Sequence, residues 1–410
     1  MTTLYKDFSQ VVTLQGAHQK DGRLLTPDDL SIINDGAVIF DDDKILWVGK
    51  TKDIPQDITI DTTQSFKGHA LLPELVDSHT HCVFGGNRSV EYGMRLNGAD
   101  YQDIAKAGGG ILASMKGTND LSRKELFELG RERIERILSY GVGTIEIKSG
   151  YGLNYEKEKE LTEVIDELKK YFAPRVQIFN TFMAAHAVPK DYNDSHAYMQ
   201  QVVIPLLQEL APRKIIDAVD IFHEEGYFDD ADLKFLAEAA TALKIPLKTH
   251  VDEFTDNKGA KLSAELAALS CDHLLCTEKD GIQALAKSKT VATLLPGTGF
   301  FLGKPQANAR ALLDVGVKVA IGSDYNPGSC NCDNLLLIAS IAAPTYKMNL
   351  GELWAAITLN AAHALGLTDQ GAILPGLKPR FSLFKVNQIE EITYNWGRNY
   401  STSNKSITAR

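Results

Sequence analysis

Apolar and polar positions alternate in two different textures along the chain. In the middle, short apolar runs alternate with segments in which apolar residues recur every three or four positions, for instance 155–172 and 257–269. This alternation predicts parallel β/α units, because strands covered on both faces are continuously apolar and their covering helices are amphipathic. We count eight such runs, at 71–79, 142–147, 176–182, 217–222, 245–249, 271–276, 290–295 and 317–322.

Eight parallel strands with helical crossovers predict an α/β fold, a (β/α)8 TIM-like barrel, whose chemistry lies at the C-terminal strand ends. Both ends of the chain differ from this centre. They contain short β-type runs and turn signals, including FSLFKV and EITYNW after Pro375-Gly376. We therefore expect residues 1–67 and 366–410 to form one small β-sandwich domain beside a barrel at 68–365.

Composition narrows the functional classes. The 410 residues include 44% hydrophobic and 23% charged ones, which is typical of a globular protein. A net charge of -10 without any basic run argues against nucleic acid or an anionic membrane as partner. The start resembles no signal peptide and no apolar stretch approaches the roughly 18 residues of a membrane span, so we expect a cytoplasmic protein. Five cysteines without a C-x-x-C pair indicate neither a disulfide framework nor a thiolate zinc site.

Histidines gather where the predicted strands end. Six of the ten lie at or near such ends, namely His79, His81, His186, His223, His250 and His273. The eighth run is followed by Asp324. Histidines scattered at random along the chain would not gather at strand ends. The prediction of a barrel and the prediction of a site at its mouth therefore support each other.

His79 and His81 are two residues apart on a strand, so both can face the barrel mouth. An H-x-H pair alone is weak and is more often a solvated or hydrogen-bonded pair. With His250 and Asp324 at later strand ends, a metal site becomes the better interpretation. Three imidazoles and one carboxylate suit Zn²⁺ or Fe²⁺, either of which lowers the pKa of a bound water toward neutrality.

Four further residues have a structural and a chemical interpretation. Asp324 can ligate a metal and take a proton, or it can be a turn residue before Asn326-Pro327-Gly328. Glu253 can carry a proton to a leaving nitrogen, or it can be a surface glutamate. His273, inside CDHLLC, is equally compatible with a core position. Arg88 follows Gly85-Gly86 and suits a carboxylate, although a surface ion pair is the commoner fate of an arginine.

Gly108-Gly109-Gly110 lacks the sequence context of a phosphate-binding loop. We expect a lid or loop there instead.

Several long segments resemble the imidazolonepropionase family of the amidohydrolase superfamily, which are metal-dependent hydrolases on a (β/α)8 barrel. VDSHTH, HVDE, CDHLL and SD carry the likeness to the superfamily. The narrower likeness rests on HTHCVFGGNR, EYGMRLNGADYQDIAKAGGGI, EIKSGYGL, AAHAVP, LLPGTGFFL and SDYNPGS, between His79 and Ser329.

The resemblance implies hydrolysis of the cyclic amide C–N bond of 4-imidazolone-5-propanoate to give N-formimino-L-glutamate, in histidine degradation. It implies one divalent ion per subunit, Zn²⁺ or Fe²⁺, held by His79, His81, His250 and Asp324. It places Arg88 on the propionate carboxylate, with Tyr151, His186, Glu253, Asn326, Gly328 and Ser329 also around the substrate. Glu253, His273 and Asp324 are the implied catalytic groups; which of Glu253 and Asp324 releases the ring nitrogen stays open. The family also suggests a homodimer.

The sequence departs from the family pattern at four places. Pro73-Glu74 stands where Pro-Gly is usual, and Arg380-Phe381-Ser382 replaces part of a C-terminal motif. His223 stands where a cysteine is expected, so it is not counted as a ligand, and Val251 replaces an alanine.

Three alternatives remain. A deaminase acting on guanine-like or cytosine-like rings would share the H-x-x-E and S-D motifs but has no need for a carboxylate clamp at Arg88. A binuclear hydantoinase-like enzyme would want a carbamylated lysine on the fourth strand, whereas Lys148 lies on the second. A catalytically dead barrel serving as a binding module is disfavoured by the intact metal ligands.

Overall fold

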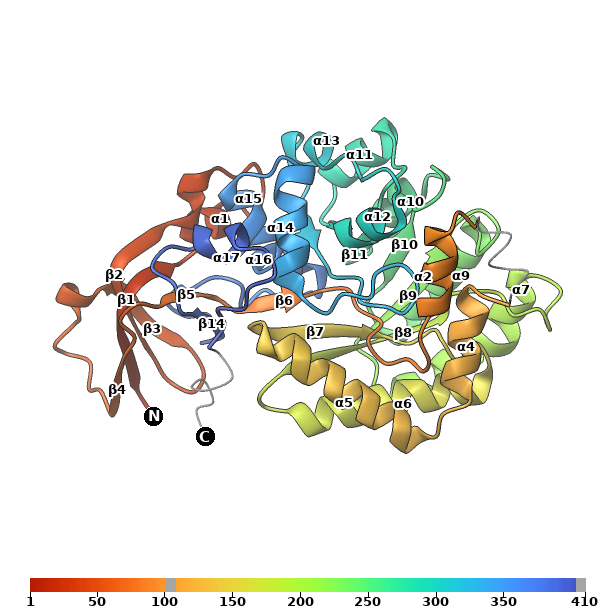
Figure 1. Ribbon diagram of the computed structural model, residues 1–410, viewed down its shortest axis with the longest axis horizontal. Coiled ribbons are helices and arrows are strands. Elements are labelled where there is room, and N and C mark those ends of the chain that lie inside the picture. Colours follow the sequence, from red (N-terminus) through yellow and green to blue (C-terminus); the bar gives the residue numbers. More distant parts are fainter. Residues whose placement is uncertain (100–107, 403–410) are drawn as a thin grey trace.

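Eight parallel strands form the centre of the molecule in the computed structural model, which describes residues 1–99 and 108–402 (Figure 1). They are hydrogen-bonded in chain order, from β6 to β13. The strands are β6 (Leu75–Asp77), β7 (Val142–Lys148), β8 (Gln177–Ala185), β9 (Ala218–His223), β10 (Lys248–Val251), β11 (Ser270–His273), β12 (Val291–Leu294) and β13 (Val319–Ile321). The expected (β/α)8 architecture is confirmed.

The barrel closes just beyond the ends of its first and last strands. Thr80 and Tyr325 form a parallel bridge. The amide of Asp324 donates to the carbonyl of His79, and the amide of His81 donates to the carbonyl of Tyr325, both at 3.0 Å. Backbone hydrogen bonds therefore hold His79, His81 and Asp324 side by side, although they are far apart in the sequence.

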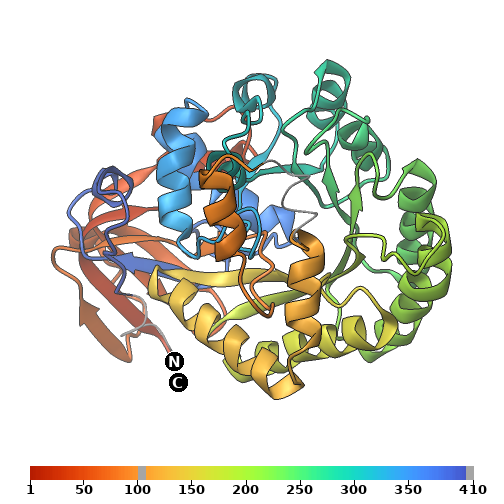
Figure 2. The same ribbon diagram turned by 45° about the vertical axis from the view of Figure 1, so that its right-hand side comes forward.

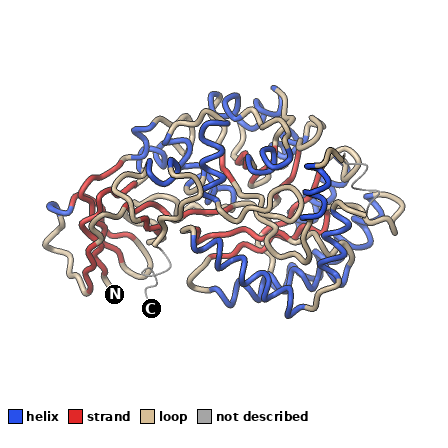
Figure 3. The backbone as a smooth tube through the Cα atoms, viewed as in Figure 1, coloured by secondary structure: helices blue, strands red, loops and turns tan. Residues whose placement is uncertain are grey.

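Helices cover the outside of the barrel (Figure 3). They are α2 (Ser89–Leu96), α4 (Ile111–Asn119), α5 (Arg123–Ser139), α6 (Tyr155–Phe172), α7 (Ser195–Tyr198), α8 (Ile204–Leu210), α9 (Asp230–Leu243), α10 (Gly259–Glu265), α11 (Lys279–Ala286), α12 (Pro296–Leu302), α13 (Ala309–Asp314), α14 (Leu335–Thr345), α15 (Leu350–Ala356) and α16 (Leu359–Ala364). The helix expected at 155–172 is confirmed as α6. In the segment 257–269 the observed helix, α10, is shorter than expected. The buried carboxylate of Asp252 accepts from the amides of Gly259 and Ala260 and so fixes where α10 begins.

A separate six-stranded sheet joins the two ends of the chain. Its order is β14-β5-β1-β2-β3, with β4 also paired to β1. These strands are β1 (Thr3–Val12), β2 (Ile32–Phe40), β3 (Ile45–Lys50), β4 (Thr62–Ser65), β5 (Ala70–Pro73) and β14 (Phe381–Phe384); the short helix α1 (Gln15–Gln19) follows β1. The domain limits after residues 67 and 365 stay a prediction.

Two segments differ from expectation. The run at 71–79 is divided, because β5 pairs antiparallel with β14 in the small sheet and only β6 enters the barrel. EITYNW is not a strand; most of it forms α17 (Glu390–Tyr394). In this segment Ile392 is buried, but Tyr394 is 82% exposed and Trp396 is 58% exposed, so its apolar residues do not cover one face of a sheet.

The departures at Glu74 and Arg380 contact each other. The guanidinium of Arg380 lies 2.8 Å from Glu74 Oε1, and it also donates to the carbonyl of Gly143 at 3.0 Å. Thr144 Oγ1 donates to the same Glu74 oxygen at 2.6 Å. These contacts join β14 of the small sheet to β7 of the barrel, so each unusual residue supplies the partner that the other needs.

All five cysteines are free, as expected. Across residues 1–99 and 108–402, no helix is both long and apolar enough to cross a membrane.

Candidate active site

The four residues expected to bind a metal meet at the C-terminal mouth of the barrel. His79 Nε2 lies 3.4 Å from Asp324 Oδ1, and His81 Nε2 lies 3.3 Å from His250 Nε2. Ligand atoms of His79, His81 and Asp324 all lie within 4.8 Å of one another. All four residues are at most 2% exposed. The structure thus brings together the complete set from strands one, five and eight.

The donor atoms of this cluster fit a divalent cation. His79 Nδ1 donates to Asp272 Oδ2 at 2.7 Å, and His250 Nδ1 donates to Asp220 Oδ1 at 3.1 Å. Because a carboxylate only accepts, each Nδ1 carries the hydrogen and each Nε2 presents a lone pair to the centre. His79 Nε2 is buried without a hydrogen-bond partner. The lone pair of His250 Nε2 faces His81 Nε2 at 3.3 Å, so either a hydrogen on His81 or a cation lies between the two nitrogens.

Two residues at the mouth have left-handed backbone conformations. His273 has φ 82° and Asp324 has φ 50°. Residues other than glycine adopt this region at a cost of about 1–3 kcal/mol, which the surrounding structure has to offset. The conformation turns each side chain at the end of its strand, so that His273 also offers a nitrogen within 4.8 Å of His79 and His250.

One wall of the mouth consists of aromatic rings. The rings of His81 and His186 are stacked, with centroids 5.0 Å apart and planes 16° apart. Tyr151 lies beside both rings, at 5.8 Å and 5.3 Å. His186 Nδ1 donates to the carbonyl of Gly150 at 3.1 Å, and burial lowers the pKa of His186 to about 4. At neutral pH this wall is therefore uncharged and suits a flat ring.

Arg88 lies at the end of the loop that connects β6 to α2. Its Nε donates to Glu91 Oε2 at 2.8 Å, so the ion pair considered from the sequence does exist. A Cβ atom on Gly328 would lie 1.9 Å from Arg88 Nη1, which means that only glycine leaves room for the guanidinium there. Glu91 Oε1 also accepts from the amide of Gly110 at 3.1 Å.

The loop after β13 is folded around Asn326. Asn326 Oδ1 accepts from the amides of Gly328 and Ser329, both at 2.8 Å, and its Nδ2 donates to the carbonyl of Asp324 at 2.7 Å. Ser329 Oγ and Thr298 Oγ1 both donate to Asp324 Oδ2. These contacts leave Oδ1 of Asp324 directed at His79, and they connect Arg88 to the metal cluster through Gly328.

Glu253 and His273, two groups suited to proton transfer, lie together at the mouth. His273 Nδ1 is 3.6 Å from Glu253 Oε2. Burial raises the pKa of Glu253 to about 8, and the negative charges of Asp324 and Glu224 add to this. Burial lowers the pKa of His273 to about 4. At neutral pH, Glu253 is therefore protonated and His273 is a neutral imidazole.

Asp324 differs from Glu253 although both are buried. Burial opposes its charge, but the imidazole of His79, 3.4 Å from its Oδ1, holds the pKa of Asp324 well below its ordinary value. One carboxyl group at the mouth can thus donate a proton while the other accepts one.

Glu224 positions the loop that carries Glu253. Its Oε2 accepts from the amides of Glu253 and Phe254, both at 2.9 Å, and Thr255 Oγ1 donates to its Oε1. Glu224 was not singled out from the sequence alone. Its neighbour His223 turns away, since its Nε2 is bonded to Asp230 Oδ1 at 2.8 Å. His223 is not among the described groups that can hold a metal, as expected.

The sequence analysis missed a group of buried charges below the metal ligands. It consists of Glu146, Lys148, Asp220, Lys248 and Asp272, all at most 1% exposed. The available signal was that charged residues stand inside otherwise apolar strands, where a strand covered on both faces should have none.

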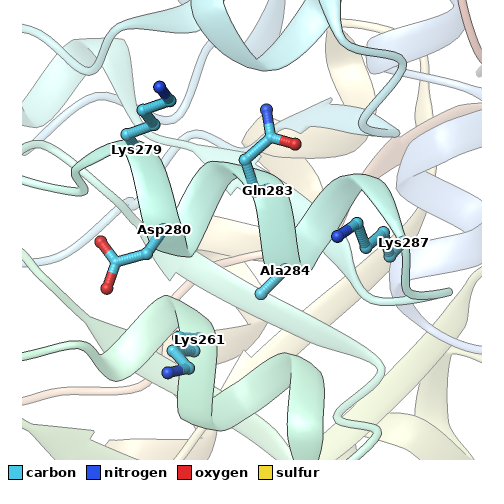
Figure 4. Close-up of a pocket in the computed structure, with 6 residues that line it drawn as sticks. All are labelled: Lys261, Lys279, Asp280, Gln283, Ala284 and Lys287. Atoms are coloured by element: carbon cyan, nitrogen blue, oxygen red, sulfur yellow. The ribbon is translucent and has the colours of Figure 1, made fainter.

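Three features of the molecule concern residues that are not counted in this site. Residues 100–107 of the segment EYGMRLNGADYQDIAKAGGGI are outside the described part of the chain. The pocket in Figure 4 lies between α10 and α11, on the outside of the barrel, and no residue expected in the site lines it. Figure 2 shows α2, in orange, in front of the barrel strands; its Tyr92 stacks on Phe301 of α12 with ring centroids 5.4 Å apart.

Comparisons with known proteins agree with this geometry. A model of the amidohydrolase family matches residues 70–404. The imidazolonepropionase of Paracoccus denitrificans is 38% identical over 386 residues, covering 92% of this chain and 95% of the relative. The imidazolonepropionase of Clostridium tetani is 37% identical over 404 residues, covering 97% and 94%.

Among solved structures, an adenosine deaminase from Xanthomonas campestris with bound zinc superposes with a TM-score of 0.69 at 17% sequence identity. The alignment covers 98% of this chain and 90% of that one. At such low identity this likeness supports the barrel fold alone.

Proposed function

Because the chain belongs to the imidazolonepropionase family of the amidohydrolases, we propose that its barrel mouth opens the ring of 4-imidazolone-5-propanoate by hydrolysis of the cyclic amide C–N bond. The product is N-formimino-L-glutamate, an intermediate of histidine degradation. The observation that carries this proposal is the metal cluster of His79, His81, His250 and Asp324, together with an arginine, Arg88, whose guanidinium packs against Gly328 in the loop that follows Asp324.

One divalent ion per subunit, Zn²⁺ or Fe²⁺, would be held by His79, His81, His250 and Asp324. The fit rests on the unpartnered, buried Nε2 of His79 and on the facing Nε2 atoms of His81 and His250. Such an ion, when bound, polarises a substrate carbonyl and lowers the pKa of a water molecule. The donor set suits zinc and iron alike, so the choice between them depends on which is available.

The remaining residues bind and orient the substrate. Arg88 pairs with the propionate carboxylate through the part of its guanidinium that Glu91 leaves unused. The imidazolone ring lies against the uncharged wall of Tyr151 and His186. Asn326, Gly328 and Ser329 shape the loop between these two contacts, and the hydrogen bonds of Asn326 keep that loop rigid.

The proton transfers follow from the environments of three groups. Ionised Asp324 takes a proton from the attacking water, whose oxygen forms the new bond to the ring carbonyl carbon. Neutral His273 donates a hydrogen bond to the carbonyl oxygen as that oxygen gains negative charge. Protonated Glu253 then gives its proton to the ring nitrogen as the C–N bond breaks. Proton exchange with solvent restores Asp324 and Glu253.

Replacing Glu253 by glutamine is expected to lower kcat by about 10²–10⁴-fold, because the amide keeps the shape but cannot protonate the leaving nitrogen. KM should change much less, since the carboxylate clamp at Arg88 is untouched. Steady-state kinetics of the metal-loaded variant measure both parameters. A variant with wild-type kcat would show that another group protonates the nitrogen.

Glu265→Gln serves as the matched control for this substitution, because Glu265 is a glutamate at the end of α10, away from the mouth. Its kcat should stay within about twofold of wild type, since substitutions away from such sites have small effects.

The overall reaction is tested by following the loss of imidazolone absorbance in the ultraviolet with metal-loaded protein. Decay faster than the spontaneous rate supports the proposal, and decay at the spontaneous rate contradicts it. Metal analysis of the same sample separates the alternatives. A barrel that binds no transition metal, and stays inactive after reconstitution, would be a binding module rather than an enzyme.

The homodimer and the cytoplasmic location stay predictions. The substrate assigned here is a small molecule.

A further inference from the structure

Five buried charged residues form a layer beneath the metal ligands, which we call the charge layer: Glu146, Lys148, Asp220, Lys248 and Asp272. They come from four barrel strands, β7, β9, β10 and β11, of which the last three are adjacent while β8 separates β7 from β9. Lys148 Nζ lies 2.8 Å from Glu146 Oε2, 2.6 Å from Asp220 Oδ2 and 3.6 Å from Asp272 Oδ2. Lys248 Nζ lies 3.4 Å from Glu146 and 3.7 Å from Asp272. All five side chains are fully buried.

The charge layer is bonded directly to two of the metal ligands. Asp272 accepts from Nδ1 of His79, and Asp220 accepts from Nδ1 of His250. Lys148 contacts both of these carboxylates. An imidazole held in this way cannot turn over or move its hydrogen to Nε2, so its lone pair stays directed at the metal.

Burying three carboxylates without cations would be very costly, and a lone buried pair is rarely stabilising by itself. Two ammonium groups reduce the charge of the charge layer to one negative unit. Lys248 also donates to the carbonyl oxygens of Ser78 and Ala364, at 3.3 and 3.4 Å, which fixes it in place next to the first strand. The charge layer is therefore an arranged network rather than a chance pair.

The same carboxylates would otherwise suit a second cation. The groups Asp220–His250–Asp272 and His79–Glu146–Asp272 each bring three possible ligand atoms within 4.8 Å. The ammonium of Lys148 already contacts Glu146, Asp220 and Asp272. The ammonium of Lys148 thus lies where a cation bound to either of these two groups would lie.

We propose that Lys148 and Lys248 are positioning residues that act as internal counter-ions in place of a second metal ion: they hold Asp220 and Asp272 against the ligand imidazoles and restrict the mouth to one divalent ion. This inference rests on the proposed function for the metal cluster. It adds that the orientation of His79 and His250 depends on residues that touch neither metal nor substrate.

The test compares metal binding in three variants, with zinc affinity measured by chelator competition and metal content by elemental analysis. Asp272→Asn is expected to bind Zn²⁺ about 10–100-fold more weakly than wild type, as is typical when the carboxylate behind a ligand histidine is lost. Lys148→Met/Asp220→Asn keeps the net charge of the charge layer and should weaken binding by a similar factor. Lys148→Met alone is the third variant. If this variant does not fold, the double variant, which keeps the net charge of the charge layer, is compared with wild type instead.

Glu74→Gln is the matched control, because it also removes a buried carboxylate paired to a cation but contacts no ligand histidine. Its zinc affinity should stay within about threefold of wild type even where its thermal stability falls. The absorption spectrum of Co²⁺-loaded protein gives a second readout, since reoriented imidazoles change the ligand field while a purely structural loss does not.

Two results would overturn the proposal. Zinc affinity of Asp272→Asn and of the double variant within about threefold of wild type would show that the charge layer does not position the ligands. Wild-type protein that binds two zinc ions per chain with similar affinity would show that Lys148 does not replace a second ion. Failure of the proposed function looks different: metal affinities would follow this pattern while imidazolone absorbance failed to decay.

Discussion

Replacing Asp324 by asparagine is expected to lower kcat by about 10³–10⁴-fold, the largest effect we expect from a single substitution. Asp324 has two tasks, since its Oδ1 faces the ligand cluster and its low pKa keeps it ready to accept the proton of the attacking water. Asparagine has almost the same shape and leaves the loop around Asn326 intact, but its amide cannot accept that proton. Steady-state kinetics and metal content, measured on the same preparation, separate the two tasks.

A variant that retains its metal but loses activity would assign the loss to proton transfer. A variant that loses both would assign it to ligation. The control is Asp333→Asn, because Asp333 lies on the same side of the barrel but pairs with Arg136 at the surface. Its kcat should stay within about twofold of wild type. If Asp324→Asn retained more than about a tenth of wild-type kcat, Asp324 would have neither task.

Replacing Arg88 by methionine is expected to lower kcat/KM by about 10²–10³-fold, mainly through a higher KM. Losing a charge-assisted pair in a mostly buried site costs about 2–5 kcal/mol, an interval that contains this range of effects. Arg88→Lys should recover only part of the loss, since lysine retains the charge but not the planar fork. Initial rates over a range of substrate concentrations measure the effect.

A substrate analogue without the propionate carboxylate provides the control for Arg88. Wild type should turn it over poorly, and Arg88→Met should turn it over no worse than wild type does, because the two deletions remove the same contact. Losses that multiply would place the carboxylate elsewhere. Undisturbed turnover of the full substrate by Arg88→Met would show that Arg88 does not hold the propionate carboxylate.

The barrel could be predicted from the sequence because its signals are local. The spacing of apolar residues at 155–172 coincides with α6, and seven of the eight apolar runs became barrel strands without division. The exceptions depend on long-range contacts. Ala70–Pro73 belongs to the small sheet because β14, some three hundred residues later, pairs with it. No local pattern distinguishes that partner from a neighbouring barrel strand.

The site was predictable to a similar degree. His79, His81 and Asp324 follow strand ends and His250 lies near the end of β10, so the barrel itself brings them together. Their supporting carboxylates Asp220 and Asp272 were missed, although each stands inside an apolar strand. Lys148 reaches both carboxylates from β7, a strand adjacent to neither of theirs, so these contacts became visible only in the folded chain.

Arg88 shows that a structural and a chemical interpretation can both hold. The sequence left open a surface ion pair or a carboxylate clamp. The structure shows the ion pair with Glu91, and the guanidinium also packs against Gly328 of the loop after β13, which the proposal places around the substrate. Glu91 lies one turn further along the same helix and was not considered, because sequence alone does not say that its side chain is buried.

The central claim is that the barrel mouth adds water across a ring C–N bond without releasing a nitrogen atom. Mass spectrometry of the product formed from imidazolonepropanoate by metal-loaded protein tests this most directly. The account predicts a product heavier than the substrate by one water molecule, with both ring nitrogens retained and with no ammonia released. Release of ammonia with conservation of the ring would contradict it and would identify a deaminase.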